Sequence, residues 1–125
     1  MTPDPSSSLR LGRIAATLGV SDIQRASAVY QAVFGFEKVF ENGNPTGFMI
    51  LQKDDAELHL SLQKTYKPPA FNQAHMLVSN ADAAYKACEA HGLRIIRRLE
   101  DKDYGLRAFV FADPDGNRID VGQIV

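Results

Sequence analysis

Residues 107–123 read RAFVFADPDGNRIDVGQ, and residues 47–63, which read GFMILQKDDAELHLSLQ, align with them without a gap 60 positions earlier. In this alignment Gln63 falls on Gln123, and the acidic turn at residues 53–55 falls on the acidic turn at residues 113–115. Each stretch has two short apolar runs on either side of polar turn residues, the pattern of a β-hairpin. Two hairpins at a fixed offset indicate an internal repeat, and a repeat determines the fold of the whole chain.

The repeat extends to the beginning of each half. VSDI at residues 20–23 leads into an apolar pattern that ends at Gly35, and VSNA at residues 78–81 leads into a similar pattern that ends at Gly92. Serine, aspartate and asparagine cap the first turn of helices, and glycine ends them. Alternating apolar residues precede both caps, and those before the first predict a strand from about residue 13 to residue 20, with Ile14 on its buried face. Each half therefore begins with a strand and a capped helix.

Together these segments give the order strand, helix, strand, strand, strand, twice. The prediction is a single α+β domain over residues 9–125, built from modules at about 10–63 and 72–124. Residues 64–71, with two prolines, form the linker, and residues 1–8, rich in proline and serine, are expected to be a flexible tail.

Composition limits the classes of function. The chain has 125 residues, of which 45% are hydrophobic and 23% charged, as in ordinary soluble domains. A net charge of −1 gives no reason to expect a nucleic-acid partner, and no apolar run is long enough to span a membrane. A single cysteine, Cys88, cannot form an internal disulfide, so nothing requires an oxidising compartment. We expect a cytoplasmic protein with no nucleic-acid or membrane partner.

Two stretches resemble a known family. FADPDGNRID at residues 111–120 is similar to the last hairpin of the vicinal oxygen chelate superfamily of glyoxalases, bleomycin-resistance proteins and extradiol dioxygenases, and residues 20–36 are similar to its first helix. The ending VGQ at residues 121–123 is most similar to the bleomycin-resistance branch. The resemblance implies that the strands curl into a mixed sheet that forms a cup, with the ligand on its concave face. It also implies a homodimer.

Alternation along the strands predicts which side chains face that ligand. If Leu58 and Leu60 lie under a helix, Glu57 and His59 point the other way. By the same rule, Ile119 and Val121 lie under a helix and Asp120 faces the ligand, and Met76 is a core residue and His75 faces the ligand. Tyr104 follows a charged loop and, with Tyr66 and Phe71, is expected to place aromatic rings at the mouth of the cup. One of Arg107 and Phe109 is expected to line it. The predicted ligand-binding residues are Glu57, His59, Gln73, His75, Tyr104, Arg107, Phe109 and Asp120.

The resemblance also implies positions for a metal ion, because metal-using members have four ligands at the opening and closing strands of the two halves. The opening positions fall on Ala15 and Gln73. One closing position falls on Asp120, and the other falls on either Glu57 or His59, depending on the length of the hairpin turn. Alanine has no donor atom, so we expect no metal cofactor at a complete four-ligand site.

Two functions follow. The first is a small-molecule-binding protein of the bleomycin-resistance type, which sequesters an organic ligand in a dimeric cleft without a catalytic metal. The alternative is a lyase, isomerase or dioxygenase of the glyoxalase type. It would use a divalent zinc, nickel, manganese or iron ion, held by His59, His75 and Asp120. Asp120 and His59 are then the candidate catalytic residues.

Overall fold

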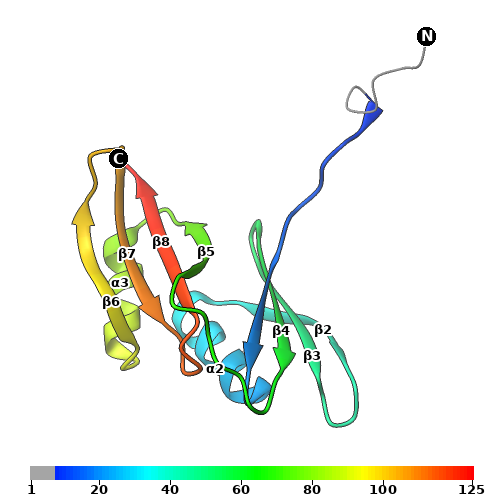
Figure 1. Cartoon of the computed structure of the whole chain (residues 1–125). Coiled ribbons are helices and arrows are strands. Elements are labelled where there is room, and N and C mark those ends of the chain that lie inside the picture. Colours follow the sequence, from blue (N-terminus) through cyan, green and yellow to red (C-terminus); the bar gives the residue numbers. More distant parts are fainter. Residues whose placement is uncertain (1–7) are drawn as a thin grey trace.

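The computed structural model describes residues 8–125, and Figure 1 shows its two modules side by side. The first module consists of β1 (Ala16–Val20), α2 (Ile23–Phe34), β2 (Glu37–Asn42), β3 (Phe48–Lys53) and β4 (Ala56–Leu62). The second consists of β5 (Asn72–Leu77), α3 (Ala81–Ala90), β6 (Arg94–Asp101), β7 (Leu106–Ala112) and β8 (Arg118–Ile124). The predicted α+β fold of two tandem βαβββ modules is confirmed. Of the predicted tail, residues 1–7 lie outside the described residues.

Each module forms its own four-stranded sheet. Sheet A has the strand order β1-β4-β3-β2, and sheet B has the matching order β5-β8-β7-β6. The first strand of each module pairs in parallel with the last, while the other pairs are antiparallel. The strands β1 and β5 each form one edge of their sheet, and they contact each other where the two modules meet.

The first helix, α2, begins and ends as its sequence predicts. The Asp22 side chain accepts a hydrogen bond from the backbone N–H of Arg25 at 3.0 Å, which satisfies an amide of the first turn. Gly35 ends the helix with a φ angle of 79°, in the left-handed region that costs glycine little. The equivalent helix α3 is capped by Asn80, whose side chain accepts from the N–H of Ala83.

Both helices pack on the same side of their sheets and share one core. Helix α2 contacts β3 and β4, and α3 contacts β6, β7 and β8. Aromatic rings join the modules: Phe34 on α2 lies 5.5 Å from Phe111 on β7, and Tyr30 lies 6.5 Å from it, between ring centroids. We call the side of each sheet that faces this core the helix face and the other side the open face. The predicted core residues Leu58, Leu60, Ile119 and Val121 are buried in the helix faces, and Cys88 is buried in α3.

One strand prediction is wrong at its beginning. The predicted first strand began near residue 13 and placed Ile14 in the core, but β1 begins at Ala16 and Ile14 is 93% exposed. Ala16 pairs with Leu58, only two residues after β4 begins, so little of the partner strand remains for earlier residues. Residues 9–15 form no strand and run on beyond the start of β1 (Figure 1), although Arg13 still reaches Glu57 on β4. Within residues 8–125, neither helix has the length and apolar content that a membrane span requires.

Candidate functional site

A charged cluster occupies the open face of sheet A. The Nε2 atom of His59 lies 2.7 Å from Oε2 of Glu57, two residues earlier on β4. Gln52 donates to the other carboxylate oxygen at 2.7 Å, and Arg13 donates to it at 3.2 Å. The hydrogen bonds from His59, Gln52 and Arg13 hold the pKa of Glu57 below its ordinary value. The cluster therefore presents an ionised, well-oriented carboxylate beside an imidazole.

Aromatic rings extend this cluster across the sheet. The ring of Phe48 lies edge-on to His59 at 5.4 Å and to Phe40 at 6.3 Å, between centroids. Phe40 is half exposed. Ile50 lies between Phe40 and His59, because it pairs in register with both. An exposed group of aromatic, imidazole and carboxylate side chains can stack against and hydrogen-bond a planar organic molecule.

A second histidine–carboxylate pair lies on the open face of sheet B. Nδ1 of His75 on β5 lies 2.8 Å from Oδ2 of Asp120, its partner in register on β8. A Cβ atom added at Gly122 would lie 3.3 Å from Cε1 of His75, so glycine at this position leaves room for the ring. Because a carboxylate only accepts, His75 donates from Nδ1, and its Nε2 is left for a ligand.

Strand register settles which residue of sheet A corresponds to Asp120. His59 pairs with Thr17, three residues before Val20, and Asp120 pairs with His75, three residues before Val78. The counterpart of Asp120 is therefore His59. The second hairpin has one residue more in its turn, since Gln52 pairs with Glu57 but Ala112 pairs with Arg118. The offset is 60 before the turn and 61 after it, so the sequence match of Gln63 with Gln123 is not a structural equivalence.

A polar network joins the two modules beside these faces. Asn117, which is fully buried, accepts hydrogen bonds from Tyr66 at 2.6 Å and from Gln73 at 2.8 Å. Its amide donates to the carbonyl of Gly19 at 2.8 Å and to Asp113 at 3.0 Å. The side chain of Gln73, which was predicted to face the ligand, is therefore used mainly in hydrogen bonds within the protein. The turn 113–117 and the linker residue Tyr66 fix the position of one module against the other.

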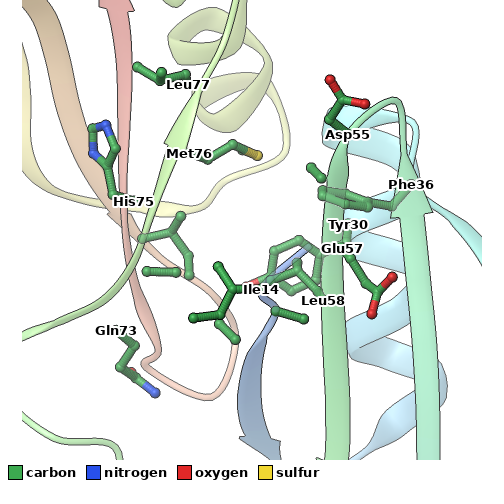
Figure 2. A pocket seen from close by; sticks show the side chains of 15 residues that line it. Ile14, Tyr30, Phe36, Asp55, Glu57, Leu58, Gln73, His75, Met76 and Leu77 are labelled. Atoms are coloured by element: carbon green, nitrogen blue, oxygen red, sulfur yellow. The ribbon is translucent and has the colours of Figure 1, made fainter. Parts of the chain in front are cut away.

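A cleft of about 770 Å³ lies between the modules, where β4 and the residues before β1 face β5. Figure 2 shows Ile14 between β4 and β5, with Met76 on one side of β5 and with His75 and Leu77 on the other. Three of the predicted ligand-binding residues, Glu57, Gln73 and His75, line this cleft. His59 and Asp120 do not, so a single chain does not gather the predicted site into one hollow.

Two predicted site residues lie on the wrong side of sheet B. We expected Arg107 or Phe109 to line the cup, but Phe109 is 1% exposed and its ring lies 5.1 Å from that of Tyr85 on α3. Arg107 forms ion pairs with Asp82 and Asp101, and Asp82 is in the first turn of α3. Residues 107 and 109 share the helix face because side chains alternate along β7.

Tyr104 lies in the turn between β6 and β7 and is 66% exposed, as a mouth residue would be. This turn is at one end of sheet B. Asn117, to which Tyr66 is hydrogen-bonded, is at the opposite end of the sheet. The structure therefore does not bring these two tyrosines together.

The residues present do not fit a metal site within one chain. Ala15 has no donor atom, and His59 and His75 belong to different sheets, each beside a different carboxylate. Among residues 8–125, three or more histidine, cysteine, aspartate or glutamate side chains do not come together in a cluster suited to a metal ion. The proposed ligand trio of His59, His75 and Asp120 is not assembled within the chain.

Two features of the site were missed from the sequence. Phe40 and Phe48 belong to the open face, and the alternation of buried Met49 and Leu51 along β3 is a signal that places Phe48 opposite them. The role of Asn117 had no such signal, because its partners Tyr66, Gln73 and Gly19 are 44 to 98 residues away in sequence.

Comparisons with known proteins agree with this architecture. A member of the glyoxalase/bleomycin resistance protein/dioxygenase superfamily from Sphaerobacter thermophilus is 28% identical, with 92% of this chain and 98% of that chain covered and a TM-score of 0.75. The bleomycin resistance determinant encoded on transposon Tn5 is 24% identical (91% and 98% covered, TM-score 0.76). TnmS3, an antibiotic-binding protein from Streptomyces sp. CB03234, is 21% identical (94% and 98% covered, TM-score 0.74).

The comparison with curated proteins gave no significant match. The family model of the Glyoxalase/Bleomycin resistance protein/Dioxygenase superfamily matches residues 10–121, nearly the whole chain. With both modules present and in the expected order, the chain belongs to the Glyoxalase/Bleomycin resistance protein/Dioxygenase superfamily.

Proposed function

We propose that the protein binds a small organic ligand on the open faces of its two sheets and does not transform it. The observation that carries the proposal is the group formed by the half-exposed Phe40 and the partly buried Phe48, His59 and Glu57. Solvent-exposed aromatic rings beside an oriented charge are costly in an ordinary surface and favourable in a recognition site. The similarity to the Tn5 bleomycin resistance determinant and to TnmS3 supports a binding role.

We further propose that two copies complete the site. Leu11 and Ile14 precede β1 and are 87% and 93% exposed, although each is large and apolar. The same chain has a mostly apolar cleft beside the edge strand β5, with Leu77 55% exposed at its side. Ile14 itself lines this cleft, so the exposed apolar side chains and the cleft form one surface, which the same surface of a second copy covers in the proposed symmetric dimer.

Equilibrium dialysis against bleomycin and a panel of planar aromatic antibiotics tests the binding role. We expect saturable binding of at least one compound and recovery of that compound unchanged by mass spectrometry. Phe40→Ala should weaken binding about tenfold, since one aromatic contact contributes on the order of 1 kcal/mol or more. Val125→Ala, which trims a similarly exposed side chain at the C-terminus, is the matched control. A chemically altered product would contradict the proposal.

The alternative, a metal-dependent enzyme, has one observation in its favour: the closing positions of the two modules carry His59 and Asp120, which are both competent ligands. Elemental analysis after incubation with nickel, zinc or manganese separates the two functions. Stoichiometric metal that is lost in both His59→Ala and Asp120→Ala would favour the enzyme. Weak binding that is unchanged in these variants favours the metal-free protein.

A further inference from the structure

The open faces of the two sheets carry opposite charge at equivalent positions. Strand register defines rows of neighbouring side chains across each sheet. On sheet A the row nearest the hairpin turn holds Glu37, Gln52 and Glu57. On sheet B the equivalent row holds Arg94, Ala112 and Arg118. Two glutamates in one module are thus replaced by two arginines in the other.

The next row of side chains on the open faces also differs in charge between the two sheets. On sheet A it holds Phe40, Ile50 and His59, and on sheet B it holds Arg97, Val110 and Asp120. Three arginines, Arg94, Arg97 and Arg118, therefore lie on the open face of sheet B. Ion pairs and side-chain hydrogen bonds connect other arginines of the described chain, such as Arg13 and Arg107, but none is formed by these three guanidinium groups within residues 8–125.

Small side chains form the floor between the arginines. Ala108, Val110 and Ala112 stand where sheet A has Phe48, Ile50 and Gln52. They are 1%, 4% and 5% exposed although the helices pack on the other face. The burial of Val110 and Ala112 is consistent with the long arginine side chains of their rows lying over them, since arginine covers apolar surface with its stem and keeps its charged end in water.

Nearby carboxylates offset only part of this charge. Asp120 is bonded to His75 at 2.8 Å, and Glu100 is bonded to Lys102 at 2.7 Å. The hydrogen bond from Lys102 and the charge of Arg98 and Arg97 keep the pKa of Glu100 below its ordinary value, so each acid already has a basic partner. Counted together with Lys102, the three arginines outnumber the two acids by four to two, so positive charge remains in excess on this face.

We infer that the open face of sheet B binds an oxyanion of the ligand, a carboxylate or a phosphate, through Arg94, Arg97 and Arg118. Guanidinium groups bind both oxyanions through paired N–H donors. The inference rests on the proposed binding function and gives the ligand a chemical class: an organic acid, with an apolar part suited to the aromatic group of sheet A.

Four naphthalene probes test the charge preference by isothermal titration at constant ionic strength. They are 1-naphthoate, 1-naphthyl phosphate, the uncharged 1-naphthalenemethanol and the cationic 1-naphthylmethylamine. Both acids should bind at least about tenfold more tightly than the alcohol, because one charge-assisted hydrogen bond contributes about 1.5 to 3 kcal/mol. The tighter of the two acids identifies the preferred oxyanion. Equal or tighter binding of the amine would overturn the inference.

Variants assign the effect to these arginines. Arg94→Gln and Arg97→Gln change exposed side chains, so the fold should be retained, and each should weaken acid binding about tenfold without changing alcohol binding. Lys86→Gln removes one positive charge from α3, on the helix face of the same sheet, and is the matched control. Equal losses in all three variants would show a non-specific charge effect and contradict the inference.

A titration with inorganic phosphate examines the oxyanion contact without the aromatic part. We expect the backbone amide NMR signals of Arg97, Val110 and Ala112 to shift at constant ionic strength in the native protein but not in Arg94→Gln. If neither phosphate nor 1-naphthoate moves these signals, the inference is wrong. Alcohol binding that persists at Phe40 and Phe48 in that case would leave the proposed binding function intact.

Discussion

The side-chain amide of Asn117 donates a hydrogen bond of 2.8 Å to the backbone carbonyl of Gly19, 98 residues earlier in the chain. This bond connects the last hairpin turn of the second module to the first strand of the first module. The neighbouring Ser21 donates from its hydroxyl and its backbone N–H to Asp115 of the same turn. The turn is therefore a structural connection between modules, and it fixes how the two open faces are oriented.

Loss of this connection should destabilise the whole protein. Asn117→Ala removes bonds to Gly19, Asp113, Tyr66 and Gln73 and leaves several buried polar groups unpaired, at a cost of about 3 kcal/mol in the free energy of unfolding. Urea denaturation measures the change. Asn72→Ala, at an exposed position, should change stability by less than about 0.5 kcal/mol. Equal effects of the two variants would show that the network is unimportant.

Gly19 is required because the ring of Tyr66 lies where its Cβ atom would be. Gly19→Ala forces this ring away, and overpacking of this kind costs about 1 to 3 kcal/mol. Gly47→Ala is the matched control, since a Cβ atom there meets nothing within 4 Å. Thermal denaturation should show a lower Tm for the first variant only. An unchanged Tm for Gly19→Ala would mean that Tyr66 is not held in place.

Asp113 should make folding less favourable as the pH rises. Burial raises the pKa of its carboxyl, although Asn117 and Tyr30 donate to it and offset part of the shift. With a folded pKa above the unfolded value, the folded state holds the proton longer. The contribution of Asp113 to stability is full below its ordinary pKa and decreases as the pH rises through its raised pKa.

Comparison with Asp113→Asn isolates the contribution of Asp113 to stability, because carboxylates with lowered pKa values, such as Glu57, are present in both proteins. The difference in unfolding free energy, native minus variant, should become smaller as the pH rises above about 4, the ordinary pKa of an aspartate. Urea denaturation across this range measures it. A difference that grows with pH would contradict the assignment.

The proposed dimer depends on apolar residues that a single chain leaves in water. Leu11→Ser and Ile14→Ser should leave the stability of the monomer nearly unchanged but weaken dimerisation by about 1.5 to 3 kcal/mol each, the free energy of burying such a side chain. Light scattering after size exclusion, over a range of concentrations, measures the dissociation constant. Val39→Ser, also at an exposed apolar position, is the control. A native protein that is monomeric at all concentrations refutes the dimer.

Much of the fold could be predicted because local chemistry recurs in both halves. The caps at Asp22 and Asn80 and the glycine end at Gly35 depend on neighbouring residues alone, so the sequence contains the information. Alternation likewise places Glu57 and His59 opposite the core leucines of β4.

Features that depend on the partner strand could not be predicted. Ile14 has the alternation of a strand residue, but β4 provides little to pair with it. Arg107 and Phe109 were placed on the open face because nothing local indicates which side of β7 meets α3, whereas the structure decides it through Tyr85 and Asp82. The one-residue difference between the hairpin turns left the counterpart of Asp120 open until register assigned it to His59.

The central claim, that the open faces receive an organic ligand, is tested most directly by mapping the binding of 1-naphthalenemethanol with backbone amide NMR spectra. The account predicts saturable shifts at Phe40, Phe48 and His59 on sheet A, with little change at α2 and α3. Shifts confined to the helices, or no saturable shift at any amide at millimolar probe concentration, would contradict it.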